Sequence, residues 1–265
     1  MKIAFFSDIH ANLPALEAVL QAIDAENPDM LFCLGDLVGY NIWPDEVIEM
    51  LRDRKIPTIA GNYDEGIGLN SDDCGCAYKS DDEKAWGAVS ISFTNKKIKS
   101  ENREYLKGLP RHIRLELQFN NENFNLLMVH GSPRRINEYL FEDRPEKSLL
   151  RIIRDANADI MLFGHTHKPY HRILEYEEED KKKFCHAINI GSVGKPKDGD
   201  PRAGFVTIEY PQPSTTIGPE ALSNLDKDSF SVKFHRVEYD VEKAALAVEK
   251  STLPDVYADM LKKGF

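Results

Sequence analysis

The chain has 265 residues, of which 42% are hydrophobic and 29% are charged, proportions that suit a globular protein with a sizeable core. Its formal net charge of −10 argues against general attraction to the nucleic-acid backbone, which requires a basic surface. Four cysteines are too few for a disulfide scaffold, and no apolar run approaches the roughly 18 residues of a membrane span.

These properties predict a cytoplasmic protein that binds neither nucleic acid nor a membrane. The length suits a single domain over residues 1–265, with its core over about 2–240 and a helical segment over 241–265. The sequence leaves the oligomeric state open.

Short apolar runs alternate with amphipathic stretches along the first 60 residues. The runs 3–6, 30–34 and 57–60 are predicted as buried strands. Helical spacing of apolar residues predicts helices over about 14–25 and 44–54. Each predicted strand ends shortly before a polar residue, and α/β sheets place their chemistry at the carboxyl ends of strands in this way.

Strands and helices continue to mix along the rest of the chain. The expected elements are an irregular loop over 65–80, a helix over 80–106, strands over 113–119 and 124–129 joined by a turn over 120–123, a helix over 145–156, a strand over 160–163, a strand-rich region over 170–209, a loop over 211–228, a strand over 231–239 and one or two closing helices.

Five motifs carry the same kinds of side chain, and each is expected directly after a strand. They are Asp8-Ile9-His10, Gly35-Asp36, Gly61-Asn62, His130-Gly131 and Gly164-His165-Thr166-His167. Carboxylate, imidazole and amide oxygen together indicate a site for borderline divalent metals. Each motif alone is weak, since a Gly-Asp pair is often only a turn, but five in series are specific. Seven ligands suit two ions that share a carboxylate, and Asp36 is the natural bridge.

With Val129 preceding His130-Gly131, these motifs resemble the calcineurin-like metallophosphoesterase superfamily over roughly residues 2–207. The resemblance implies an α/β fold, a four-layer αββα sandwich in which two mixed β-sheets are flanked by helices. It also implies two divalent transition-metal ions, drawn from manganese, iron, zinc and nickel. One ion is assigned to Asp8, His10, Asp36 and His167, and the other to Asp36, Asn62, His130 and His165.

The third motif departs from the superfamily pattern. It reads Gly61-Asn62-Tyr63-Asp64, whereas many members have a histidine in place of Tyr63 that protonates the leaving oxygen. A tyrosine, with an ordinary pKa near 10, suits this role less well at neutral pH. Tyr63 is therefore either a catalytic group or a packing aromatic. Asp64 either supports the metal ligands from behind or is an exposed turn residue.

The tyrosine variant resembles a prokaryotic branch related to small phosphodiesterases and diadenosine tetraphosphatase-like proteins. A Gly-Ser-Val-Gly turn over 191–194 is expected to present backbone N–H groups to an anion. Lys195 and Arg202 are then candidates to neutralise a second phosphate, and Arg134 and Tyr139 are further candidates for substrate binding. The alternative for these residues is a polar loop with solvated charges.

The cysteine pair Cys74-Gly75-Cys76 is a weak metal motif, because no second pair of ligands accompanies it. It is predicted as a loop feature that shapes the mouth of the pocket.

The predicted function is hydrolysis of a small phosphodiester or nucleotide phosphoanhydride by metal-activated hydroxide attack on phosphorus. Asp36, Asn62, Tyr63 and Asp64 form the predicted catalytic set. The expected partner is a small phosphorylated substrate, such as a nucleotide. Absence of the histidine favours good leaving groups and disfavours the first alternative, a protein Ser/Thr phosphatase. The acidic charge disfavours a nuclease, and the complete ligand set disfavours a non-catalytic scaffold with a phosphoesterase fold.

Overall fold

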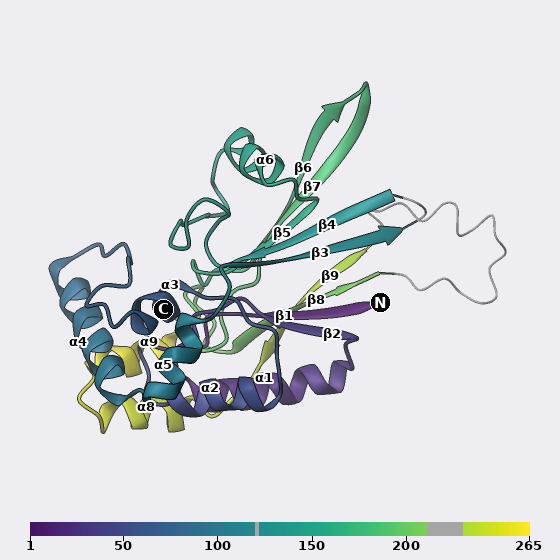
Figure 1. Cartoon of the computed structure of the whole chain (residues 1–265). Helices are drawn as coiled ribbons and strands as arrows, with labels where there is room; N and C mark the ends of the chain where they lie inside the picture. The colour runs from purple at the N-terminus through teal and green to yellow at the C-terminus, as the bar shows by residue number, and fades with distance from the viewer. Residues whose placement is uncertain (120–121, 211–229) are drawn as a thin grey trace.

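The computed structural model of the chain describes residues 1–119, 122–210 and 230–265 and contains two mixed β-sheets packed between layers of helices (Figure 1). The four-stranded sheet has the order β2-β1-β8-β9, and the five-stranded sheet has the order β3-β4-β5-β7-β6. The strands are β1 (Lys2–Phe6), β2 (Met30–Cys33), β3 (His112–Phe119), β4 (Glu122–Val129), β5 (Ile160–Phe163), β6 (Tyr170–Glu178), β7 (Lys181–Asn189), β8 (Ala203–Glu209) and β9 (Ser231–Val237).

The helices of the described residues lie mainly outside the sheets. They are α1 (Leu13–Glu26), α2 (Pro44–Asp53), α3 (Asn62–Gly68), α4 (Asp81–Lys97), α5 (Ser100–Lys107), α6 (Glu146–Asp155), α8 (Val241–Glu249) and α9 (Val256–Lys263). Figure 1 shows α1 and α2 along the outer side of the four-stranded sheet, α8 beyond the ends of its strands, and α6 beside the five-stranded sheet. The predicted four-layer sandwich is confirmed.

Strand β1 shows how the sequence produces these layers. Its successive side chains point to opposite faces of the sheet. Ile3 and Phe5 therefore pack into the core between the two sheets, whereas Ala4 and Phe6 pack against the helical layer. Because both faces of the strand are buried, its sequence is a continuous apolar run instead of an alternating one.

Parallel pairing brings the ends of the motif-bearing strands to common edges. Strand β1 is parallel to β2, and β5 is parallel to both β4 and β7. The carboxyl ends of parallel strands lie at the same edge of a sheet. The residues that follow β1 and β2 in one sheet, and β4 and β5 in the other, are therefore brought together between the sheets.

The third motif sits on a different element from the one predicted. The run 57–60 forms only an isolated bridge, between Cys33 and Thr58, and helix α3 begins within the motif itself. Helix α3 was not predicted from the sequence because it contains glycines, which are unfavourable in helix interiors. A Cβ atom added at Gly66 would lie 2.6 Å from Cys74 Sγ, so close packing explains this glycine.

The single helix predicted over 80–106 is two helices, α4 and α5, separated at Ile98 and Lys99. No glycine or proline marks the break. A distant side chain stabilises it instead, since the Lys99 backbone N–H donates to Asp45 Oδ1 at 3.0 Å.

The predicted loop over 211–228 and part of the predicted turn over 120–123 lie outside the described residues. Helices α8 and α9 pack into the same apolar cluster as α1 and α2, although a single domain remains a prediction. Among the residues with described positions, no helix is long and apolar enough to cross a membrane.

Candidate metal centre

The side chains predicted as metal ligands lie together at the converging strand ends. Within each of two groups, the potential ligand atoms are all within 4.8 Å of one another. The first group is Asp8, His10 and His167, and the second is Asp36, His130 and His165. The remaining predicted ligand, Asn62, places its Oδ1 atom 3.2 Å from His130 Nε2. None of these side chains belongs to a residue more than 3% exposed.

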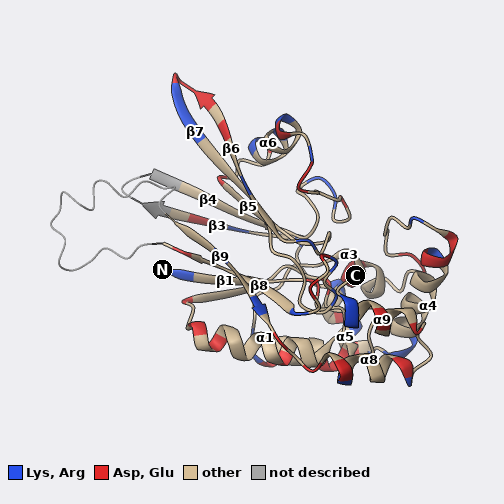
Figure 2. Ribbon diagram, turned by 180° about the vertical axis from the view of Figure 1, so that it is seen from behind, with Lys and Arg blue, Asp and Glu red and all other residues tan. Residues whose placement is uncertain are grey.

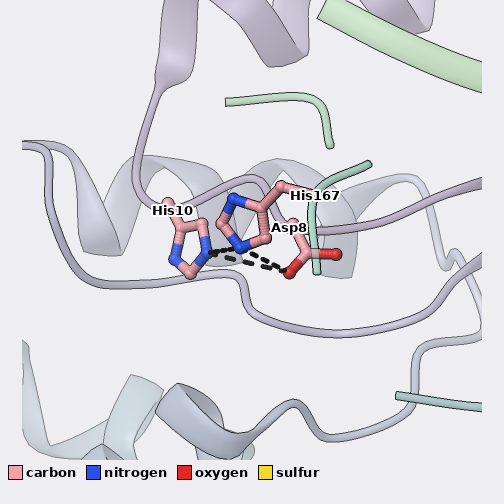
Figure 3. A group of neighbouring side chains, drawn as sticks. All are labelled: Asp8, His10 and His167. Carbon is pink, nitrogen blue, oxygen red and sulfur yellow. Dashed lines mark hydrogen bonds and ion pairs between the residues drawn. The ribbon is translucent and has the colours of Figure 1, made fainter. Parts of the chain in front are cut away.

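The first group is arranged around two facing imidazole nitrogens (Figure 3). His10 Nε2 lies 3.2 Å from His167 Nε2, which in turn lies 3.1 Å from Asp8 Oδ1. The Nδ1 atom of His10 contacts the carbonyl of Val38, and that of His167 contacts the carbonyl of Lys195. A carbonyl only accepts, so each Nδ1 carries the proton and each neutral ring presents a lone pair at Nε2. Two such lone pairs at this separation repel each other, and a cation bound by both nitrogens would remove this repulsion.

Asp36 connects the two groups. Its Oδ2 atom lies 3.6 Å from His10 Nε2 and 3.3 Å from His130 Nε2. Its other oxygen accepts a hydrogen bond from the backbone N–H of Tyr63 at 2.8 Å, which fixes the carboxylate orientation. One carboxylate oxygen therefore faces histidines of both groups, which is the geometry expected of a bridging ligand.

The side chains fit two divalent cations. Asp8 Oδ1 and His165 Nε2 are buried and lack a hydrogen-bond partner anywhere in the described part of the chain. Leaving a buried polar atom without a partner costs roughly 1–3 kcal/mol. Burial, reinforced by nearby positive charge, lowers the pKa of His165 and of His167 to about 3, so both rings are neutral near pH 7 and able to coordinate. Carboxylate, imidazole and amide donors suit borderline metals.

The backbone is strained at most of these ligands. Positive φ angles occur at Asp8 (55°), His10 (48°), Asp36 (54°), His165 (64°) and His167 (60°). Such conformations cost of order 1–3 kcal/mol each for residues other than glycine, and they concentrate at functional sites. These backbone conformations direct the side chains toward the centre, either just after a strand or within a loop.

Asp64 holds two ligand-bearing turns together. Its Oδ1 atom accepts from the N–H of Leu37 and its Oδ2 atom from the N–H of Gly61, both at 2.9 Å. Burial and the charge of Asp36 raise the pKa of Asp64 to about 7. A Cβ atom at Gly61 would lie 2.1 Å from Asp36 Oδ1, so glycine permits the close approach of the turns. Of the two roles predicted for Asp64, the structure shows the buried supporting one.

The Cys74-Gly75-Cys76 segment orients the amide of Asn62. Asn62 Nδ2 donates to the carbonyl of Cys74 at 2.8 Å and contacts Cys76 Sγ at 3.4 Å. Because both donors of the amide face the cysteines, Oδ1 is directed toward His130. Burial raises the pKa of the Cys76 thiol, which favours its protonated form over a metal-binding thiolate.

The sequence model of the calcineurin-like phosphoesterase superfamily domain matches residues 1–212 of the chain. The chain belongs to this superfamily.

Other proteins resemble this phosphoesterase-superfamily chain over nearly its whole length. The uncharacterized protein MJ0912 of Methanocaldococcus jannaschii is 34% identical over 275 residues, covering 99% of this chain and 98% of that protein. A crystal structure of a metallophosphoesterase from Sphaerobacter thermophilus is 29% identical with a TM-score of 0.70, covering 100% of this chain and 99% of that chain. The hypothetical protein PH1004 from Pyrococcus horikoshii shares the fold at 22% identity, with a TM-score of 0.74 and coverage of 100% and 98%.

Tyr63, predicted as either a catalytic group or a packing aromatic, has its ring buried against neighbouring aromatic rings. It is 1% exposed, and its ring lies 5.4 Å from that of His10 and 4.8 Å from that of Tyr40. Its hydroxyl is buried without a hydrogen-bond partner of good geometry among the described residues. Burial raises its pKa well above the ordinary value, which makes it a weaker acid.

The predicted substrate-binding residues of this phosphoesterase-superfamily protein fall into two pairs. Tyr139 lies beside the centre, with its ring 4.1 Å from that of His165, and Lys195 is buried behind His167, with its ammonium group 4.9 Å from the Tyr40 ring. Arg134 and Arg202 both have carboxylate partners, Glu138 and Asp200 respectively. The structure therefore brings Tyr139 to the centre, buries the Lys195 ammonium group behind it next to Met260 Sδ, and pairs the two arginines with carboxylates.

The turn over 191–194 differs from its predicted role as an anion cradle. The N–H groups of Val193 and Gly194 donate to the carbonyls of Ser7 and Asp8, at 2.9 and 3.0 Å. Ser192 Oγ also donates to the Asp8 carbonyl, at 2.8 Å. These hydrogen bonds fix the backbone at the end of β1 and so hold Asp8 in place. Because the donors are used by carbonyl groups, they are not available to bind an anion.

Two residues important for the centre were not predicted. Asn189 Nδ2 donates at 2.9 Å to both the Gly164 carbonyl and Thr166 Oγ1, which fixes the loop that carries His165. Lys197 lies close enough for its charge to lower the pKa of His167 and of His165. The sequence offered one signal for each residue. Asn189 is a polar residue at the end of an apolar strand, and Lys197 is a second lysine close after Lys195.

Proposed function

We propose that the protein is a hydrolase that uses two divalent transition-metal ions to cleave a small phosphodiester or a nucleotide phosphoanhydride. The observation that carries this proposal is the position of Asp36 Oδ2, within 3.6 Å of His10 Nε2 and 3.3 Å of His130 Nε2. Bound by the two groups, such ions supply Lewis acidity toward phosphate oxygens and activate water as the nucleophile. The ligands leave manganese, iron, zinc and nickel as alternatives.

The burial of the centre supports a small substrate. Every ligand residue is at most 3% exposed, so a phosphoester must pass the residues around the centre to reach it. Tyr139, whose ring lies 4.1 Å from that of His165, and Cys76, which contacts Asn62 Nδ2, are two of these residues. A phosphorylated side chain on a folded protein is harder to admit than a small soluble molecule, which disfavours a protein Ser/Thr phosphatase.

Lys197 supplies positive charge for a phosphate group. Burial lowers the pKa of Lys197, and the nearby carboxylates of Asp8 and Asp36 partly offset this by favouring its charged form. Its ammonium group makes no hydrogen bond or ion pair with any residue in the described ranges. A free ammonium group beside two metal-binding groups is suited to contact the phosphate that is cleaved.

The environment of Tyr63 supports a preference for good leaving groups. Its buried hydroxyl and raised pKa make it a poor replacement for the histidine that protonates a leaving oxygen. Reactions that expel a phosphate or an aryl oxide need this proton least. Phosphoanhydrides and aryl diesters are therefore expected to react faster than alkyl monoesters.

The test is a substrate panel with metal titration. Protein loaded with each metal is assayed on bis-p-nitrophenyl phosphate, p-nitrophenyl phosphate and diadenosine tetraphosphate. We expect turnover of bis-p-nitrophenyl phosphate, diadenosine tetraphosphate or both. This activity should be lost in His165→Ala and kept in His235→Ala, which changes a histidine on β9 outside the centre. Absence of turnover with every metal, or an active His165→Ala variant, would contradict the proposal.

A further inference from the structure

Arginine side chains line two adjoining cavities next to the metal centre. The first cavity has a volume of about 380 Å³, contains Arg111, Arg114, Arg134 and Arg135 in its wall, and reaches His130. The second has a volume of about 350 Å³, shares all of these arginines except Arg114, and reaches Asn62. Because His130 and Asn62 belong to the same predicted ion site, both cavities border that part of the centre.

Two of these guanidinium groups are not balanced by a carboxylate. Arg114 donates to the carbonyls of Ala156 and Asn157 at 2.5 and 2.6 Å, and these partners carry no formal charge. Arg135 makes no side-chain hydrogen bond or ion pair within the part of the chain that the structure describes. The other two arginines have the carboxylate partners Glu65 and Glu138.

Two further acidic residues line the cavities, one in each. Asp155 faces the first cavity, but its carboxylate lies 3.5 Å from Arg151 Nε. Asp73 lines the second cavity, where its Oδ1 atom accepts from the Gly75 N–H at 2.8 Å. The first cavity, with four arginines and one carboxylate in its wall, is therefore the more cationic of the two, in a chain whose formal net charge is −10. In Figure 2, by contrast, the ribbon of α1 and α4 is red at several acidic residues.

A folded turn carries Arg134 and Arg135. The Ser132 N–H donates to the Arg135 carbonyl at 3.0 Å, and Ser132 Oγ accepts from the N–H groups of both arginines at 3.1 Å. The same hydroxyl donates to Glu138 Oε2 at 2.5 Å. The turn is thus held by its own hydrogen bonds before a ligand arrives, which reduces the entropy lost on binding.

We propose that the two cavities, together called the arginine pocket, bind the phosphate chain of an oligophosphate. Guanidinium groups bind phosphate oxygens in pairs, and the cavity volumes suit part of a small ligand. The chain is either the distal part of the substrate, with its cleaved phosphate at the metal centre, or a free oligophosphate. The substrate form of the proposal rests on the proposed function and narrows it to phosphoanhydrides; the binding site itself does not depend on turnover.

Binding is tested by calorimetric titration of the full-length protein with tripolyphosphate. The variants are Arg135→Ala and, as a matched control, Arg54→Ala, an arginine at the end of α2 paired with Asp24. All proteins are brought to the same metal content, so that the contribution of bound ions to tripolyphosphate affinity cancels. We expect Arg135→Ala to weaken binding about tenfold, the effect of losing a charge-assisted contact, and Arg54→Ala to have no effect.

Arg135 has no partner to lose among the described residues, so its variant is expected to fold normally. A double variant, Arg114→Gln with Arg135→Ala, is expected to weaken binding further. The proposal is overturned if wild-type protein does not bind tripolyphosphate, or if both variants bind it as tightly as wild type does.

Kinetics separate the two sources of the phosphate chain. If the chain is part of the substrate, Arg135→Ala raises KM for diadenosine tetraphosphate and leaves KM for bis-p-nitrophenyl phosphate unchanged. If both KM values are unchanged while tripolyphosphate binding is weakened, the pocket binds a free oligophosphate and the substrate form is overturned. If no phosphoester is hydrolysed at all, the proposed function fails, but the calorimetric result still decides whether the pocket exists.

Discussion

Asp64 shows how one side chain can maintain a metal centre without coordinating an ion. Both of its oxygens accept backbone N–H groups, one from the turn of Asp36 and one from the turn of Asn62. Residues that orient metal ligands typically contribute 10–100-fold to metal affinity. The geometry of the bridging carboxylate and of the amide ligand therefore depends on this contact.

Asp64→Asn is expected to lower metal affinity about 10–100-fold, because the amide nitrogen cannot accept one of the two N–H groups. Competition with a chelator of known affinity measures the change. Asp53→Asn, on the exposed surface of α2, is the matched control and should bind metal as wild type does. Equal affinities for all three proteins would show that Asp64 does not position the ligands.

Lys197→Ala is expected to raise KM for a hydrolysed phosphoester about tenfold, because a charge-assisted contact to phosphate is lost. Metal content should stay unchanged, since the ammonium group is not a ligand. Steady-state kinetics and metal analysis check the two parts, with Lys250→Ala, at the exposed C-cap of α8, as control. A loss of bound metal without a change in KM would assign Lys197 a structural role instead.

The metal ligands could be predicted from the sequence, whereas most of the residues that orient them by hydrogen bonds could not. Asp8 and His165 each follow an apolar run after a single intervening residue, so local pattern and residue type were sufficient. The contact of Cys76 with Asn62 and that of Asn189 with Gly164 join segments that are 14 and 25 residues apart. Such pairings are decided by tertiary packing, and no local pattern specifies them.

The secondary-structure elements, like the residues, were predicted where local pattern determines them and missed where tertiary contacts do. Strands β1, β2 and β5 were predicted because burial on both faces makes them continuous apolar runs. Helix α3 was missed because Gly66 serves packing at the expense of helix propensity. The break between α4 and α5 was missed because a buried side chain on α2, Asp45, accepts the Lys99 N–H there.

Helix α9 connects the C-terminal segment to the metal centre. Tyr257 is 4% exposed and its ring lies 5.2 Å from that of Tyr40, which lies 4.8 Å from the ring of His10. The Gly199 N–H also donates to the Gly264 carbonyl at 2.9 Å, next to the loop that contains Lys197. The helix therefore packs behind residues that adjoin the ligands.

Tyr257→Ala is expected to destabilise the protein by about 3–5 kcal/mol, the range for removing a buried aromatic ring. Urea unfolding measures the loss, and activity at a temperature where the variant is folded tests for an effect on the centre. Tyr257→Phe keeps the ring and should lose less than about 1.5 kcal/mol. Similar losses in the two variants would indicate that the ring does not contribute through packing.

At the scale of the whole molecule, the two sheets supply opposite sides of one centre. Asp8 and Asp36 follow strands of the four-stranded sheet, and His130 and His165 follow strands of the five-stranded sheet. The buried carboxylates and the strained ligand backbones lie where the sheets meet. Ions at this position would link both halves of the sandwich, so their binding is expected to stabilise the complete fold.

Removal of the ions is therefore expected to lower the melting temperature. An ion that binds only the folded state at about 1,000 times its Kd stabilises it by about 4 kcal/mol. For a chain of this size, that corresponds to a shift on the order of 10 °C. Thermal unfolding of protein that contains metal, after chelation and after metal is restored, measures the shift. His165→Ala should show a smaller difference between the two states. An unchanged melting temperature after verified metal removal would mean that the sandwich is fully stable without its ions.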